Sequence, residues 1–105
     1  MQVPDDLREL VPAFLQDRDD DIERLFMAIK AEDWETIRRV GHQLKGSGGS
    51  YGFPRISELG AEIERNAGHV PIEVLSASLR KLHRYIASIY DEMGGRPPPK
   101  TFDER

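Results

Sequence analysis

The sequence contains no cysteine, which excludes a disulfide framework and a thiolate metal site. It has no apolar run long enough to cross a bilayer, and its first residues lack the pattern of a secretory signal. The net charge of −4 also argues against general nucleic-acid binding, because such binding needs a basic face. We therefore expect a cytoplasmic protein that binds neither membranes nor nucleic acid.

Strand-like alternation and whole-unit repeats are missing as well. Apolar residues instead recur at spacings of three and four. These spacings predict helices over residues 11–31, 33–50, 54–67 and 71–93. The connections between them are short, so neighbouring helices should be antiparallel. The expected fold is all-α, an antiparallel up-down four-helix bundle with a short N-terminal helical addition opened by Pro4.

The domain organisation follows from length and composition. A chain of 105 residues is one domain by length, and residues 1–95 are expected to form the bundle. Residues 96–105 include three consecutive prolines and are predicted to be a disordered tail or a linker. The acidic run 17–21 has two interpretations: a solvated face of one continuous helix, or a loop that caps a second helix starting at Ile22.

One stripe of the predicted second helix carries side chains that can take part in a reaction. It holds, at i, i+3, i+4 and i+7, the residues His42, Lys45, Gly46 and Gly49. A helix that buries Leu44 turns His42 outward, with a cation one turn further on. A neutral imidazole is a nucleophile near physiological pH. The stripe therefore predicts an accessible nucleophile beside a positive charge.

The glycines after His42 weaken the helix, since each interior glycine costs about 1 kcal/mol relative to alanine. Gly48 falls on the Leu44 side, where it suits close packing of a neighbouring helix. Gly46 lies on the outward stripe, where neither packing nor helix termination explains it. We interpret Gly46 as room for a large partner to reach the imidazole.

The string HQLKGSGGSYG, residues 42–52, resembles the signature of histidine-containing phosphotransfer (HPt) domains, roughly H-x-L-K-G-[small]-[small]-x-x-x-G. The resemblance covers about residues 5–93. It implies a phosphorelay intermediate that accepts a phosphoryl group from a receiver-domain phosphoaspartate, or from a sensor histidine kinase, and passes it to another receiver. The implied protein is a phosphoryl carrier rather than an enzyme with its own ATP site.

The resemblance also implies roles for individual residues. His42 would be phosphorylated, Lys45 would stabilise the phosphoryl oxygens, and Gly46 would give the receiver access. The family often has glutamine near the position of Glu64, where it hydrogen-bonds the histidine. A glutamate there could orient the ring, but its charge would repel the phosphate.

Two arginines precede His42 by four and three residues. Arg38 and Arg39 form with Lys45 a basic patch on an acidic protein, and this patch would attract the acidic pocket of a receiver. With Gly49 they are the candidate partner-binding residues. The alternative is ordinary surface charge paired with Glu35.

No metal or nucleotide site is evident. The chain has no Walker-type loop and no acidic cluster in the motif, so we expect no cofactor, with Mg²⁺ bound in the partner receiver. His69 and His83 complete no metal-binding spacing. The expected protein is a monomer. A competing function is a non-enzymatic helical adaptor bundle that binds a partner without carrying phosphate.

Overall fold

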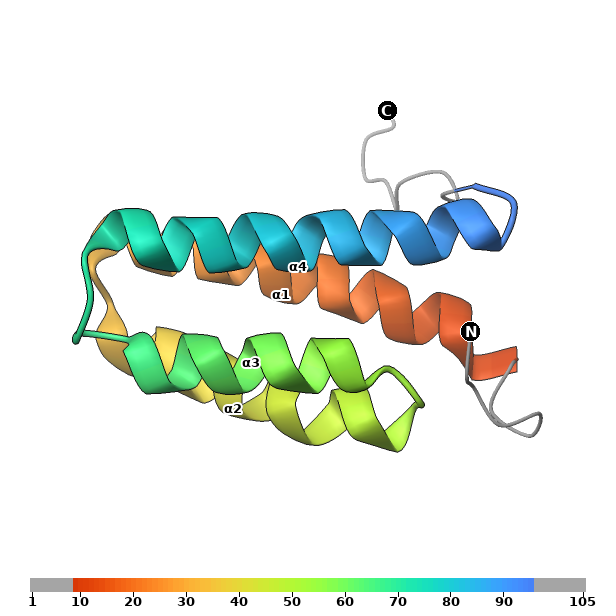
Figure 1. Ribbon diagram of the computed structural model, residues 1–105, viewed down its shortest axis with the longest axis horizontal. Helices are drawn as coiled ribbons and strands as arrows, with labels where there is room; N and C mark the ends of the chain where they lie inside the picture. Colours follow the sequence, from red (N-terminus) through yellow and green to blue (C-terminus); the bar gives the residue numbers. More distant parts are fainter. Residues whose placement is uncertain (1–8, 96–105) are drawn as a thin grey trace, which may run out of the picture.

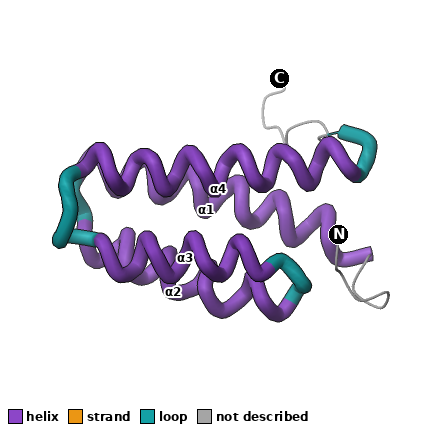
Figure 2. The backbone as a smooth tube through the Cα atoms, in the orientation of Figure 1, coloured by secondary structure: helices purple, strands orange, loops and turns teal. Residues whose placement is uncertain are grey.

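A computed structural model describes residues 9–95, which form four helices joined by short loops (Figures 1 and 2). The helices are α1 (Val11–Ala31), α2 (Trp34–Ser50), α3 (Pro54–Asn66) and α4 (Ile72–Glu92). Within the described residues, α1 packs against α2 and α4, and α3 packs against the same two helices, while the backbones of the diagonal pairs stay apart. The predicted all-α, up-down four-helix bundle is confirmed. The predicted N-terminal addition and the tail 96–105 lie outside the described residues.

The helix ends have local causes. The side chain of Asp33 accepts a hydrogen bond from the Thr36 N–H at 3.2 Å, so Asp33 caps α2. Both α1 and α3 carry a proline in the first turn, where the missing N–H costs nothing. Gly52 and Gly68, with φ of 84° and 81°, follow α2 and α3. Their left-handed backbone turns the chain into the next helix.

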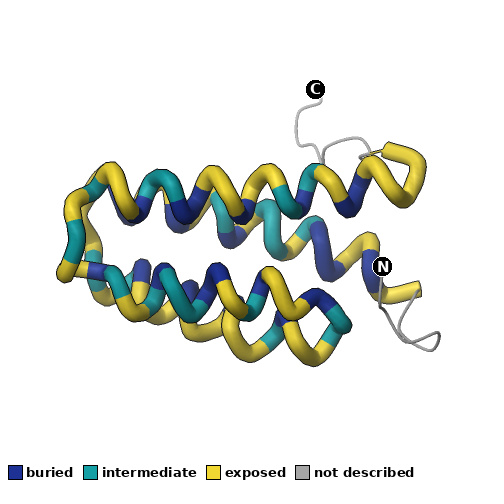
Figure 3. The backbone as a smooth tube through the Cα atoms, in the orientation of Figure 1, coloured by how far each residue is buried: buried dark blue, intermediate teal, exposed yellow. Residues whose placement is uncertain are grey.

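Each helix presents one buried stripe to the centre of the bundle (Figure 3). Burying one large apolar side chain, such as Leu or Ile, stabilises the fold by about 1.5–3 kcal/mol relative to leaving it exposed. Trp34 and Tyr51 are half-buried and pack against this core from its edge. The fully buried aliphatic side chains include Leu15, Leu25, Ile37, Leu44, Ile56, Leu59, Ile63, Leu75, Leu82 and Ile86.

The acidic run 17–21 lies inside the continuous helix α1. The interpretation as a loop is therefore wrong, and the solvated-face interpretation is wrong for Asp21, which is only 2% exposed. Asp21 accepts hydrogen bonds from Arg24 and, at 2.8 Å, from the Nε of Arg18. Arg18 also donates to the Ser47 hydroxyl on α2 at 3.2 Å. A buried carboxylate needs such partners, and here they join α1 to α2.

Three glycines let α2 and α3 approach until their backbones touch. A Cβ on Gly41 would lie 2.8 Å from the backbone nitrogen of Glu64, and one on Gly48 would lie 2.6 Å from that of Ser57. From the α3 side, a Cβ on Gly60 would come within 2.6 Å of a backbone nitrogen of α2. The packing role predicted for Gly48 is confirmed. This contact decides which α3 side chains reach the His42 stripe.

Candidate functional site

His42 lies in the middle of α2 with its side chain 69% exposed. Its Nδ1 is 3.1 Å from Oε2 of Glu64, which lies on α3 and is 30% exposed. A carboxylate only accepts hydrogen bonds, so in the neutral ring Nδ1 is the nitrogen that carries the proton. The contact therefore selects the tautomer in which Nε2 has the available lone pair.

Lys45 completes a group of three charged or titratable side chains. Its Nζ is 3.6 Å from Oε1 of Glu64, and its side chain is 52% exposed. Glu64 thus contacts the imidazole with one oxygen and the ammonium with the other. An ion pair this exposed contributes only about 0–1 kcal/mol. Lys45 can consequently turn toward a stronger anion at small cost.

The surface beside His42 has no side-chain cover at Gly46. Among residues 9–95, a Cβ built on Gly46 would have no neighbour within 4 Å outside the backbone of α2, in contrast to the glycines that pack against α3. Gly49 is also exposed, and its N–H donates to the Ser57 hydroxyl at 2.9 Å. The structure thus separates the two glycine faces in the way the sequence predicts.

The two arginines before His42 differ in their surroundings. Arg38 donates from Nη1 to the backbone carbonyl of Ala67 at 3.3 Å, at the C-terminal end of α3. This contact differs from the surface pair with Glu35 that the sequence suggests. Arg39 is exposed and lies near the N-cap of α2. The pKa of Asp33 lies below its usual value, mainly because of the Thr36 side-chain and backbone hydrogen bonds, with a smaller attraction to Arg39.

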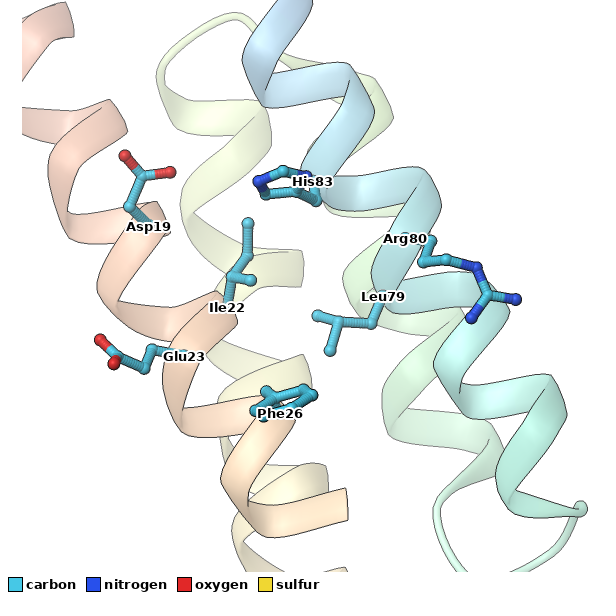
Figure 4. Close-up of a pocket in the computed structure, with 7 residues that line it drawn as sticks. All are labelled: Asp19, Ile22, Glu23, Phe26, Leu79, Arg80 and His83. Atoms are coloured by element: carbon cyan, nitrogen blue, oxygen red, sulfur yellow. The ribbon is translucent and has the colours of Figure 1, made fainter. Parts of the chain in front are cut away.

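The other histidines lie apart from this stripe. His69 is exposed in the loop after α3. His83 lies in a surface hollow between α1 and α4, facing the acidic Asp19 (Figure 4). Within residues 9–95, no three His, Cys, Asp or Glu side chains are grouped to hold a metal ion. The hollow is lined by Asp19, Ile22, Glu23, Phe26, Leu79, Arg80 and His83.

Sequence reasoning missed a polar contact next to the site. The Ser57 hydroxyl on α3 donates to the backbone carbonyl of Lys45 and accepts from Gly49 N–H. A signal for it existed, because Ser57, Gly60 and Glu64 are spaced at i, i+3 and i+7 and so share a face of α3. Only the close approach of α2 and α3 shows that this face meets α2.

The fold and the site together define a helical bundle with an exposed histidine whose Nδ1 contacts a carboxylate. A model of the Hpt domain family matches residues 9–91, most of the chain, and the protein belongs to this family. Family membership makes it a component of two-component phosphorelays that works by histidine phosphotransfer. Comparisons with curated proteins and with solved structures give no match. No helix among residues 9–95 is both long and apolar enough to cross a membrane.

Proposed function

We propose that this protein carries a phosphoryl group on Nε2 of His42 between partner proteins. The donor is a receiver-domain phosphoaspartate or a sensor histidine kinase, and the acceptor is another receiver. The observation that carries the proposal is the 3.1 Å contact between His42 Nδ1 and Glu64. It leaves Nε2 as the nucleophile on a side chain that is 69% exposed.

The transfer step needs only these groups and the donor. The Nε2 lone pair attacks phosphorus, the bond from phosphorus to the aspartyl oxygen breaks, and the donor leaves as a carboxylate. The imidazole then carries the phosphoryl group on Nε2 and keeps its proton on Nδ1, where the Glu64 carboxylate balances the new positive charge of the ring. The reverse step on a second receiver restores the neutral imidazole.

Lys45 and Gly46 complete the site in this proposal. The transition state for phosphoryl transfer spreads negative charge over the equatorial oxygens. Lys45 would leave its exposed contact with Glu64 and stabilise that charge. Gly46 would let the receiver come close to the imidazole. We propose that Arg38, Arg39 and Gly49 contact the receiver around this point.

The partner supplies what this chain does not bring. We propose that the receiver binds the Mg²⁺ ion at its phosphoaspartate and that this protein has no ATP site, so it is a carrier rather than a catalyst on its own. We further propose that it acts as a cytoplasmic monomer that binds neither nucleic acid nor membranes. The net charge of −4 supports the exclusion of nucleic acid.

A transfer assay tests the proposal. A set of ³²P-labelled phosphorylated receivers is mixed with the protein, and the label that moves to it is analysed chemically. The expected label is acid-labile and alkali-stable, as a phosphoramidate is, and it maps to the peptide that contains His42. If no receiver and no small phosphodonor labels the folded protein, the bundle is an adaptor and the proposal is wrong.

A further inference from the structure

Ser57 of α3 joins two backbone groups of α2. Its hydroxyl donates to the carbonyl of Lys45 and accepts from the N–H of Gly49 at 2.9 Å. These two groups are four residues apart, the spacing of hydrogen-bond partners in an α-helix. The hydroxyl therefore bridges one turn of α2 from the side. That turn begins at Lys45, three residues after His42.

The same face of α3 meets α2 at two further levels. One turn on from Ser57, Gly60 packs directly against the α2 backbone. Two turns on, Glu64 contacts His42 and Lys45. Along this face of α3, Ser57 and Glu64 thus make the polar contacts to α2 at the two ends, and Gly60 makes a backbone contact between them. A shift of α3 along α2 would break both ends together.

Few side chains can replace Ser57 in this position. A side chain there must be short, because the Ser57 backbone lies so close to α2 that a Cβ on Gly48 would come within 2.6 Å of it. It must also donate and accept at one atom, which a hydroxyl does. Alanine would leave the bridge unmade. The register of α3 would then depend on apolar packing and on the glycine contacts alone, without the directional constraint of a hydrogen bond.

We infer that Ser57 is a positioning residue for phosphotransfer at His42, acting through Glu64. Its hydroxyl fixes the register of α3 on α2, and that register sets the Glu64 carboxylate against Nδ1 of His42 and Nζ of Lys45. The inference rests on the proposed function. Because transfer depends steeply on the placement of reacting groups, we expect Ser57→Ala to slow transfer about tenfold.

The kinetic test measures single-turnover transfer from a phosphorylated receiver over a range of receiver concentrations. Ser57→Ala should lower the rate at saturation and leave the half-saturating concentration unchanged. Ser57→Thr keeps the hydroxyl and should restore most of the rate. The control is Ser88→Ala on α4, because the Ser88 hydroxyl bonds to the carbonyl of Tyr85 in its own helix and, within the described part of the chain, to no other helix. A normal rate for folded Ser57→Ala would overturn the inference.

A double-mutant cycle tests whether Ser57 acts through Glu64. In a Glu64→Ala background, Ser57→Ala should slow transfer by less than about twofold. If it slows transfer about tenfold there as well, Ser57 does not act through Glu64 and the inference fails. Should Ser57→Ala not fold, Ser57→Cys keeps the shape of the side chain and weakens both hydrogen bonds, and it takes the same place in the cycle.

A spectroscopic readout separates this inference from the proposed function. ¹⁵N NMR of the His42 ring should show the Nδ1–H tautomer in the unsubstituted protein and a mixture of tautomers in Ser57→Ala. This measurement needs no phosphate. Failure of every donor to label His42 would refute the proposed function, whereas an unchanged tautomer in Ser57→Ala would refute the positioning role alone.

Discussion

His42 and Glu64 are 22 residues apart in the chain, yet His42 Nδ1 and Glu64 Oε2 lie 3.1 Å apart across the contact between α2 and α3. The residue beside His42 makes this contact possible. A Cβ on Gly41 would lie 2.8 Å from the backbone nitrogen of Glu64 itself. The missing side chain of Gly41 thus brings the Glu64 backbone close enough for its carboxylate to reach the imidazole.

Replacing His42 should abolish phosphoryl transfer without unfolding the bundle. His42→Gln changes an exposed side chain on a helix whose buried face is made by other residues, and such changes usually alter stability by about 0.5 kcal/mol or less. Thermal unfolding followed by circular dichroism should therefore match the unsubstituted protein. Label that persists on folded His42→Gln would move the site to another histidine, His83 or His69.

The charge of Glu64 and its hydrogen bond can be separated by two substitutions. Glu64→Gln keeps an oxygen that accepts from Nδ1, so transfer should stay within about threefold of normal. Glu64→Ala removes the acceptor, and transfer should fall about tenfold because the ring loses its fixed orientation. Transfer rates at saturating receiver distinguish the two. Equal loss in both variants would show that the negative charge matters and that orientation does not.

Lys45→Ala should slow the transfer step more than it weakens binding. A cation beside the phosphoryl group acts on charge that shifts in the transition state. Because Lys45 is 52% exposed, we expect its loss to slow transfer about 10- to 100-fold, less than the loss of a buried donor would. Stopped-flow measurements at saturating receiver give the transfer rate, and titration of the protein with unphosphorylated receiver gives the binding affinity. The rate should fall more than the affinity. Lys45→Arg, which keeps the charge, is the matched control.

Gly46→Gln should give a stable protein that exchanges phosphoryl groups poorly with a receiver. Apart from the backbone of α2 itself, no atom of the described residues lies within 4 Å of a Cβ at this position. Glutamine is also a better helix former than glycine, so stability should hold or rise by up to about 0.8 kcal/mol. The added side chain would stand between the receiver and the imidazole. Transfer from a receiver should fall severely, while phosphoramidate, a small donor, should still label His42.

Gly48→Ala, on the packed face of α2, is the control for Gly46→Gln. There a Cβ would lie 2.6 Å from the Ser57 backbone nitrogen, and overpacking of this kind costs about 1–3 kcal/mol. Denaturant unfolding should therefore rank Gly46→Gln as the more stable variant. A strongly destabilised Gly46→Gln would mean that the assignment of the two glycine faces is wrong. A stable Gly46→Gln with a normal transfer rate would refute the docking role of Gly46.

The N-cap of α2 should make stability depend on acid pH. The pKa of Asp33 is lowered in the folded protein, first by the Thr36 side-chain hydrogen bond and then by the Thr36 backbone N–H. A lowered folded pKa adds stability above the unfolded value, 3.8, and that stability is lost as the pH falls through the folded pKa. Asp33→Ala should lower the Tm at pH 7, and its difference from the unsubstituted protein should vanish well below pH 3.8.

A second substitution tests the cause of this shift. Thr36→Val removes the side-chain donor that lies 2.7 Å from the Asp33 carboxylate. Carboxyl ¹³C titration should then give a higher pKa for Asp33 than in the unsubstituted protein. An unchanged pKa would assign the shift to the backbone N–H instead.

The helices and the outward position of His42 could be predicted because they depend on local spacing. Leu44 and His42 are two residues apart, so burying one exposes the other whatever the rest of the chain does. The cap at Asp33 and the break at Gly52 depend equally on neighbouring residues. Features that depend only on neighbouring residues can therefore be predicted from the sequence.

Contacts between helices could not be predicted in the same way. Asp21 looks like one more acid in a solvated run, yet it is buried, and its partner Arg18 also donates to Ser47 of α2, a contact that depends on how the two helices pack. The bridge made by Ser57 also depends on how far α3 slides along α2. A sequence gives the faces of each helix, but the distance between two helices results from all their side chains together.

The backbone contact between α2 and α3 has a consequence for recognition. His42 is held mid-helix by two elements that cannot separate without breaking glycine packing, so a partner meets a surface that is already formed. Binding then incurs little loss of conformational entropy, and a modest interface is enough for a productive encounter. In the proposed carrier role, such a surface would allow brief complexes with fast exchange, and so contact with several partners in turn.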